Sequence, residues 1–373
     1  ASFSGDDMFK YTPLAALVAL ASLSAHAEVS IGGSAEMDLF YRTNNGANLA
    51  DTDTEGKLLE EIAIVVNVDG KDRLDDGSTL SWRLAQKVAT NYRFDSWGQR
   101  EAWIGYDNTW GTVRFGNQFS TLYLTMLDWP YGAHGVSNLT GDFGAHEVAY
   151  PSAITYLSPK FSGFSFGAQY ELGAGTGDAN AYEVTAAYAS DAFNIDAGYY
   201  QGKNSESMDS EAVSFGGSGW GSGGLYNADN KARQYFIGGR FRFGGGFEVG
   251  GAYTRHEWEG DVPNVHAAGS DKTSVDQYLL RGGYTTGKHN FTLAYQYIAD
   301  SETDSDERDD GIQAVNFQYT YNLSKQTVGF VQLRHHMLDN AGQPSVMHAS
   351  YQLDGVGHED NVTRFLVGTW TGF

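Results

Sequence analysis

The sequence contains no cysteine, only 6 prolines in 373 residues, and no apolar run long enough to cross a bilayer as a helix. A membrane-spanning helix needs roughly 20 predominantly apolar residues, and the most apolar run, 14–20 (LAALVAL), is much shorter. Without cysteine the chain forms no disulfide bonds. It suits an oxidising envelope compartment, and its fold needs no disulfide bonds for stability. These absences exclude a helical membrane protein and a disulfide-stapled module.

Basic residues are also scarce. The chain has 24 lysines and arginines against 46 aspartates and glutamates, which gives a net charge of −22. Nucleic acid phosphates repel such a chain, so nucleic acid is not an expected partner. The acidic excess either favours cations near the surface or reflects the solvation of polar loops, and composition leaves both interpretations open.

What the sequence does have is strict alternation of apolar and polar residues. The segments 291–297 (FTLAYQY) and 315–321 (VNFQYTY) show it most clearly. A period of two predicts strands with one apolar and one polar face. Because this polar chain carries 23 tyrosines, 21 phenylalanines and 8 tryptophans, we expect lipid to cover the apolar face.

Sixteen segments follow this pattern, and none is separated from the next by a helical pattern. They are 29–42, 57–69, 78–88, 99–106, 112–118, 152–162, 164–172, 182–189, 193–203, 233–243, 247–257, 275–285, 290–298, 311–322, 327–337 and 362–373. Their connectors alternate between short turns and long polar loops, and the long ones are 43–56, 119–151, 204–232, 258–274, 299–310 and 338–361. This layout predicts an antiparallel transmembrane β-barrel with both termini at the short-turn rim.

The first 27 residues are expected to be separate from the barrel. Lys10 precedes the apolar run, and Ala25-His26-Ala27 forms an A-x-A cleavage pattern, as in an export signal. We expect residues 1–27 to comprise an N-terminal extension plus a signal peptide, with Met8 as the natural start. Residues 28–373 are then the barrel.

Two stretches on either side of the long loop 119–151 carry a resemblance to a known family. The stretch 100–118 (REAWIGYDNTWGTVRFGNQ) resembles the fourth and fifth strands of Gram-negative general porins, and 154–170 (ITYLSPKFSGFSFGAQY) resembles their sixth and seventh. Phe373 matches the family's terminal assembly residue. The resemblance implies a 16-stranded barrel in the outer membrane, a homotrimer, and a long third loop folded into the lumen as a constriction.

The chain departs from this family at three places. Thr371 stands where the family usually has tyrosine, no arginine lies near Tyr150-Pro151, and 58–61 (LLEE) lacks the usual second-strand arginine. The basic side of the constriction is therefore incomplete, and its ion selectivity is not carried over from the family.

Alternation then assigns side chains to the two faces, because one step along a strand reverses the direction. It places Arg83, Lys87, Arg100 and Arg114 inside, on the third to fifth segments, where they form a basic wall of the constriction. Arg100 is the one that matches the family's ladder. Further inward arginines are expected on the far wall at 240, 242, 281, 334 and 364, with inward acids at 36, 38, 61, 171, 183, 196 and 248.

The long third loop supplies the opposite side of the predicted constriction. Its acids Asp128, Asp142 and Glu147 would set a transverse field against the basic wall, or each would pin the loop to barrel donors. Its aromatic residues Tyr123, Trp129 and Tyr131 either stack on sugar rings or pack the loop in place. Trp103, Tyr188 and Tyr297 are interpreted as lipid-facing or interfacial aromatics.

An enzyme is not expected. The sequence has no His-Glu-x-x-His or Cys-x-x-Cys pattern, and His335 and His336 are adjacent strand residues that point to opposite faces. The prediction is a passive diffusion channel for small hydrophilic solutes and ions, mildly cation-selective, with no cofactor and no metal in the pore. The alternative is a substrate-specific channel for oligosaccharides. Expected partners are copies of the chain and outer-membrane lipids with lipopolysaccharide, linked by divalent cations at acidic loops such as 51–55 and 300–310.

Overall fold

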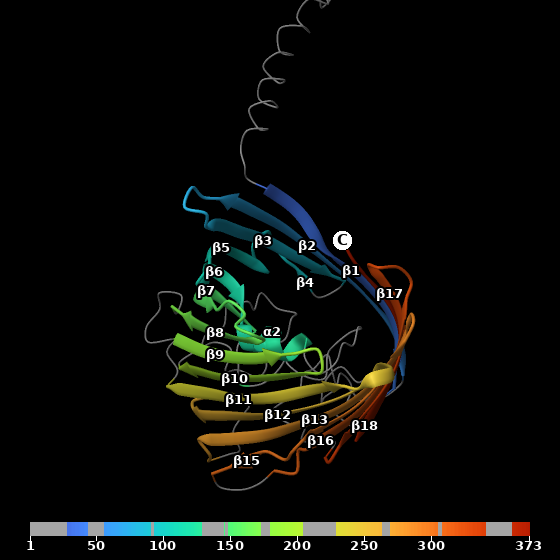
Figure 1. Cartoon of the computed structure of the whole chain (residues 1–373). Coiled ribbons are helices and arrows are strands. Elements are labelled where there is room, and N and C mark those ends of the chain that lie inside the picture. The colour runs from blue at the N-terminus through green and yellow to red at the C-terminus, as the bar shows by residue number, and fades with distance from the viewer. Residues whose placement is uncertain are drawn as a thin grey trace, which may run out of the picture.

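The chain forms a closed barrel of antiparallel strands (Figure 1). The computed structural model describes residues 28–43, 56–90, 93–128, 145, 148–172, 180–203, 229–262, 269–304, 308–340 and 360–373. Within these ranges the sheet has 18 strands, of which β4 (Arg93–Phe94) and β15 (Glu302–Thr303) are only 2 residues long. The other strands make the 16-stranded barrel that the sequence predicted.

Each long strand pairs with the next long strand along the chain, and β1 closes the ring by pairing with both β2 and β18. The long strands are β1 (Glu28–Arg42), β2 (Lys57–Arg73), β3 (Thr79–Ala89), β5 (Glu101–Asn108), β6 (Gly111–Phe119), β7 (Ala149–Leu157), β8 (Phe164–Glu171), β9 (Asn180–Ala189), β10 (Phe193–Lys203), β11 (Asn230–Arg242), β12 (Phe247–Gly260), β13 (Lys272–Thr286), β14 (His289–Ile298), β16 (Ile312–Asn322), β17 (Thr327–Leu338) and β18 (Asn361–Gly372). Closure leaves no sheet edge, which a bilayer requires because its core offers backbone groups no partner.

Alternating residues separate the two faces of this wall. On β14, Leu293 is 57% exposed, whereas its neighbour Ala294 is 1% exposed. The exposed positions on the outer face are large and apolar, such as Ile104, Phe115 and Leu280. Among the described residues, no helix is long and apolar enough to cross a membrane.

Aromatic rings gather on the outer face in two bands. Toward the long-loop rim, tyrosines succeed one another on adjacent strands, with ring centroids 5.1 Å apart for Tyr199–Tyr235 and 5.3 Å for Tyr253–Tyr278. Toward the short-turn rim, Phe193 stacks on Phe241 at 5.5 Å. An apolar belt flanked by two aromatic bands is the outer surface of a transmembrane barrel.

The two rims differ as the connector lengths predicted. At one rim lie tight turns, such as 244–246, a single 3-10 turn labelled η2 (Gly244–Gly246) in which Gly245 has φ 80°. The other rim carries the long connectors. One of them holds the helix α2 (Thr121–Asp128), which Figure 1 shows within the ring of strands.

The structure differs from the sequence prediction in three local respects. The helix α2 was not predicted, β4 and β15 are additional short strands, and β7 ends at Leu157 rather than 162. The early end of β7 follows from the turn 158–163, where Pro159 lacks an N–H donor and Ser162 and Gly163 have positive φ. Residues 1–27, the predicted extension and signal peptide, lie outside the described residues.

Candidate functional site

The polar inner face of the barrel is the candidate site, and the helix α2 is anchored on it by one carboxylate. Glu183 of β9 is 1% exposed. Its Oε1 accepts hydrogen bonds from the backbone N–H of Thr121, from that of Leu122 at 3.1 Å, and from the Thr121 hydroxyl at 2.6 Å. Its Oε2 accepts from the hydroxyls of Ser120 at 2.7 Å and Tyr150 at 3.0 Å. A carboxylate at a helix N-terminus satisfies donors that have no partner within the helix and complements the helix dipole.

The apolar side of α2 packs on the strands that follow. A Cβ built at Gly198 of β10 would lie 2.5 Å from Leu122 Cδ1, so a larger residue there would force the buried Leu122 side chain to shift. Further along, Gln234 Nε2 of β11 lies 3.1 Å from the sulfur of Met126. The helix therefore lies against the inner faces of β9, β10 and β11.

Two of the predicted basic residues belong to a network of alternating charge that we call the paired wall, made of Asp69, Arg83, Glu101, Trp103 and Arg114 on β2, β3, β5 and β6. Arg83 Nε is 2.7 Å from Asp69 Oδ1, and its Nη1 is 3.3 Å from Glu101 Oε2. Trp103 donates its indole N–H to Glu101 Oε1 at 3.1 Å, and the Arg114 guanidinium lies 4.3 Å from the centre of the Trp103 ring. The basic residues here alternate with acids, which the prediction of a basic wall did not include.

Trp103 corrects an assignment made from the sequence. The sequence predicts it to be lipid-facing or interfacial, but it lies on the inner face, is 8% exposed, and contacts two inward charged residues. The wrong face was assigned because the alternation was counted from Arg100, which lies in a bend before β5 begins at Glu101. Alternation cannot be carried across a bend, because the period of two holds only within a strand.

The other two predicted basic residues lie near the paired wall. The Arg100 guanidinium lies 4.8 Å from the centre of the Phe119 ring, next to the start of α2. Lys87 is on β3 at the same parity as Arg83, and its backbone N–H donates to Asp95 Oδ2 at 3.1 Å. Three of the four residues, Arg83, Lys87 and Arg114, lie on the neighbouring strands β3 and β6 with β5 between them, and Arg100 lies in the bend before β5. Their role as a constriction stays a prediction.

The predicted loop residues are only partly described. Asp128 ends α2, and Asp142, Glu147, Trp129 and Tyr131 lie outside the described residues. Tyr123 stacks on Phe119 with ring centroids 5.6 Å apart and is 7% exposed. Its ring thus packs the helix against the wall, which leaves little surface for a solute.

Three arginines lie side by side at one register on β1, β18 and β17, and we call them the arginine row: Arg42, Arg364 and Arg334. Arg42 is the direct partner of Arg364, and Arg364 that of Arg334. Amide groups accompany them: Arg364 Nη2 donates to Gln332 at 2.6 Å, and Arg334 Nε donates to Asn316 at 3.1 Å. The guanidinium carbon of Arg364 lies 5.8 Å from the centre of the Phe40 ring. The sequence placed Arg334 and Arg364 inside but did not predict that Arg42 aligns with them.

Acids gather at the long-loop rim. Carboxylate oxygens of Asp300, Asp309 and Asp339 lie within 4.8 Å of one another, a spacing that suits a hard cation with oxygen ligands. Desolvation, with the neighbouring carboxylates of Asp300 and Asp309, raises the pKa of Asp339. Among the described residues this is the group that could hold a metal ion.

The described residues give no support for an enzyme. The match to Gly-x-Ser-x-Gly at 163–167 places Ser165 inside β8 rather than on the strand–turn–helix elbow of a serine hydrolase. His335 and His336 point to opposite faces, since His336 is buried on the inner side and His335 Nδ1 contacts Thr363 Oγ1 at 2.8 Å. A closed barrel with an apolar belt outside and charged, amide and hydroxyl groups inside is a transmembrane channel.

The comparison with protein families agrees with this class. A family described as Gram-negative porin matches residues 14–341. The chain belongs to the Gram-negative porin family and is an outer-membrane channel, not an enzyme.

The chain is also similar to curated proteins. A chitoporin from Vibrio furnissii is 25% identical over 82% of this chain and 87% of its own length. The major outer membrane protein P.IB of Neisseria meningitidis serogroup B is 25% identical over 48% of this chain and 54% of its own length.

Solved structures show the same fold. The anion-selective porin from Comamonas acidovorans has a TM-score of 0.68 at 15% identity, covering 93% of this chain and 100% of its own. A trimer form of OmpT from Vibrio cholerae has a TM-score of 0.65 at 15% identity, covering 93% and 99%. The closed barrel predicted from the sequence is confirmed.

Proposed function

We propose that the chain is a general diffusion channel, which lets small hydrophilic solutes and ions cross the outer membrane down their concentration gradients. The observation that carries this proposal is the polar inner wall, where the arginine row and the paired wall both face the lumen. A barrel of sixteen strands is wide enough for a water-filled passage. Charged walls hold ordered water, which an apolar solute cannot replace.

The proposed ion selectivity is a mild preference for cations. On the inner wall, acids offset much of the arginine charge, as Glu248 does at 2.7 Å from Arg281. The chain as a whole carries a net charge of −22, and Asp300, Asp309 and Asp339 concentrate negative charge at the long-loop rim. A rim of this sign enriches cations at the entrance. The structurally similar Comamonas acidovorans porin is anion-selective, so the sign must be measured.

A substrate-specific oligosaccharide channel is the second candidate. The relative that covers most of this chain among those compared above is a chitoporin. The predicted stacking residues Trp129 and Tyr131 would serve such a channel, whereas the buried position of Tyr123 does not favour it.

We infer a homotrimer and assign its contact to one face of the barrel. Strands β17, β18, β1 and β2 present neighbouring aliphatic side chains in the middle of the outer face: Leu333, Val367, Met37, Leu39, Ile62 and Ile64. Aliphatic side chains from two protomers can interdigitate closely in such a contact. A trimer form of a porin with the same fold supports the assembly.

The trimer is tested by adding bulk on each face. Leu39→Trp would overpack a contact between protomers, whereas Leu293→Trp faces lipid and is tolerated. Leu39→Trp should shift the purified protein toward monomers in size-exclusion chromatography, and Leu293→Trp should not. A trimer retained in both variants would place the contact elsewhere.

The rim acids have a proposed structural partner. A divalent cation held by Asp300, Asp309 and Asp339 would bridge to the phosphates of lipopolysaccharide. Calcium-dependent retention of lipopolysaccharide should then weaken in Asp309→Asn.

The experiment that tests the channel is the zero-current potential of the purified protein in a planar bilayer under a KCl gradient. Conductance steps in triplets with a cation-selective potential would support the open trimeric channel. An anion-selective potential would leave the channel standing and reverse the assigned sign. Absence of current would contradict the channel itself.

A further inference from the structure

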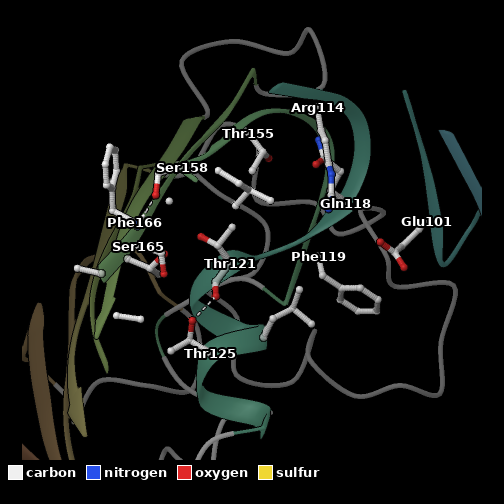
Figure 2. A pocket seen from close by; sticks show the side chains of 16 residues that line it. Glu101, Arg114, Gln118, Phe119, Thr121, Thr125, Thr155, Ser158, Ser165 and Phe166 are labelled. Carbon is white, nitrogen blue, oxygen red and sulfur yellow. Dashed lines mark hydrogen bonds between the residues drawn. The ribbon is translucent and has the colours of Figure 1, made fainter. Parts of the chain in front are cut away.

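A cavity of about 290 Å³ lies between the helix α2 and the inner wall of β6–β9, and we call it the α2 cavity. Figure 2 shows Arg114 and Thr155 on the wall side, with Thr121 and Thr125 approaching from the helix. Its volume is at the lower end for small-molecule sites, about 300 Å³. A solute the size of a single sugar ring is therefore the largest that it suits.

Two residues that line this cavity, Arg114 and Thr155, each carry a buried polar atom with no hydrogen-bond partner among the described residues: Arg114 Nε and Thr155 Oγ1. Arg114 and Thr155 are directly paired residues of β6 and β7, so the two atoms lie in the same part of the inner wall. Thr155 is 2% exposed. Because buried polar atoms are nearly always satisfied, a neighbouring pair without partners points to a missing one.

The Arg114 side chain is held in position at the cavity. Its guanidinium rests on the Trp103 ring at 4.3 Å, and Gly105 leaves room for its stem, since a Cβ there would lie 3.2 Å from Arg114 Cγ. A donor fixed in this way loses little freedom when it binds a solute.

The charges around the cavity do not favour an ion of either sign. Glu101 also lines it, and its carboxylate is engaged by Arg83 and by the Trp103 indole. Asp107, beyond the cavity lining, accepts from Ser81 at 2.6 Å and Thr112 at 2.6 Å. The positive charge of Arg114 is thus set against nearby carboxylates, and neither an anion nor a cation meets an uncompensated charge.

The rest of the lining is amphipathic. The hydroxyls of Ser165 and Thr185 add groups that both donate and accept, while Leu124 and Leu157 supply apolar surface. A sugar has this same mixture, with hydroxyl groups around its edge and C–H groups on its face.

We propose that the α2 cavity binds a neutral polyhydroxylated solute of single-ring size, with Arg114 Nε donating to one hydroxyl oxygen and the Thr155 hydroxyl pairing with the next. This binding deepens, and rests on, the proposed channel function. A solute held there would stand beside α2 and briefly reduce the ion current.

The test is current noise from single trimers in a planar bilayer, with D-glucose as the probe. Glucose should add noise to the ion current, and this noise should reach a plateau as the glucose concentration rises. Thr155→Val keeps the shape of the side chain and removes its hydroxyl, so it should weaken the apparent binding of glucose about tenfold. Arg114→Gln should also weaken it. The matched control is Thr254→Val, a buried inner-wall threonine on β12 away from the cavity, which should bind glucose as wild type does.

The outcomes separate the two proposals. If neither the wild-type protein nor any variant conducts ions, the proposed channel function is contradicted. If current is normal but glucose changes it no more than viscosity requires, the cavity assignment is overturned. Equal weakening by Thr254→Val would also overturn it, and stronger blockade by glucuronate than by glucose would overturn the neutral class.

Discussion

The paired wall and the arginine row lie on neighbouring parts of one barrel, yet they hold their arginines in different ways. In the paired wall, Arg83 is bracketed by Asp69 and Glu101. In the arginine row, cations are neighbours of cations across three strands, with amides and the Phe40 ring among their contacts. Arginine suits both settings, because its guanidinium stays ionised and its planar group stacks on rings.

The comparison teaches where the field of the lumen originates. The electric fields of two opposite charges 3.3 Å apart nearly cancel at larger distances. The paired wall therefore contributes more to the stability of the barrel than to the electric field in the lumen. In the arginine row, three guanidinium groups of like charge stand on adjacent strands, so neutralising them changes the field of the lumen more than neutralising a whole ion pair does. A solute that passes along this side of the lumen meets two adjacent surfaces with different arrangements of charge.

The largest effect is expected from detaching the helix α2 from β9, where Glu183 holds its N-terminus. Glu183→Ala removes the acceptor for four groups of residues 120–122 and for the Tyr150 hydroxyl. Leaving such buried donors without partners should cost about 3 kcal/mol or more of unfolding free energy. Frequent partial closures of the channel under voltage should accompany the loss.

Two variants control this prediction. Glu183→Gln retains one carbonyl oxygen and should give an intermediate result in both thermal stability and closure frequency. Glu171→Gln changes a buried inward glutamate on the neighbouring strand β8 and should close as rarely as wild type. If Glu183→Ala were as quiet as wild type, the helix would be held by its apolar contacts and not by Glu183.

A smaller effect should distinguish the two walls directly. Neutralising two charges of the row in Arg334→Gln/Arg364→Gln should raise the cation-to-anion permeability ratio about 16-fold, because roughly 0.4 kcal/mol per charge at about 10 Å in water acts with opposite sign on the cation and on the anion. Removing a whole pair in Arg83→Gln/Asp69→Asn should leave the ratio nearly unchanged, because no net charge is lost. Reversal potentials at low salt measure both, since salt screens the field. A larger shift from the pair than from the row would reverse the assignment of field and structure.

Most of the barrel could be predicted because its determinants are local. Alternation on segments such as 290–298 and 327–337 fixed the strands within a few residues of β14 and β17. The same parity placed Arg83, Arg114 and Glu183 inside. A lipid-exposed wall imposes this pattern on nearly every strand, so each segment carries its own evidence.

What could not be predicted depends on residues distant in the sequence. Asp69 meets Arg83 only through the register of β2 and β3, and Glu183 caps a helix 62 residues earlier in the chain. The helix itself had a local signal, since Ser120 Oγ accepts the Tyr123 N–H at 2.9 Å as an N-cap. The arginine row needs the closure of β18 on β1, which no local pattern encodes.

The smallest effect concerns the turn between β2 and β3, at the end of the paired wall. Asp76 accepts from the side chain and the backbone N–H of Ser78, and from the Tyr106 hydroxyl at 3.0 Å. These bonds, the Ser78 hydroxyl first, lower the pKa of Asp76 below its usual 3.8. A lowered carboxyl pKa contributes stability that is present above the unfolded-state value and is lost as the pH falls through the folded-state value. Asp76→Asn should therefore melt slightly below wild type at about pH 6, and the two melting temperatures should converge as the pH falls below the lowered folded-state pKa of Asp76. A difference that stayed constant across this range would mean that the bonds stabilise the turn by shape alone, with no contribution from the charge.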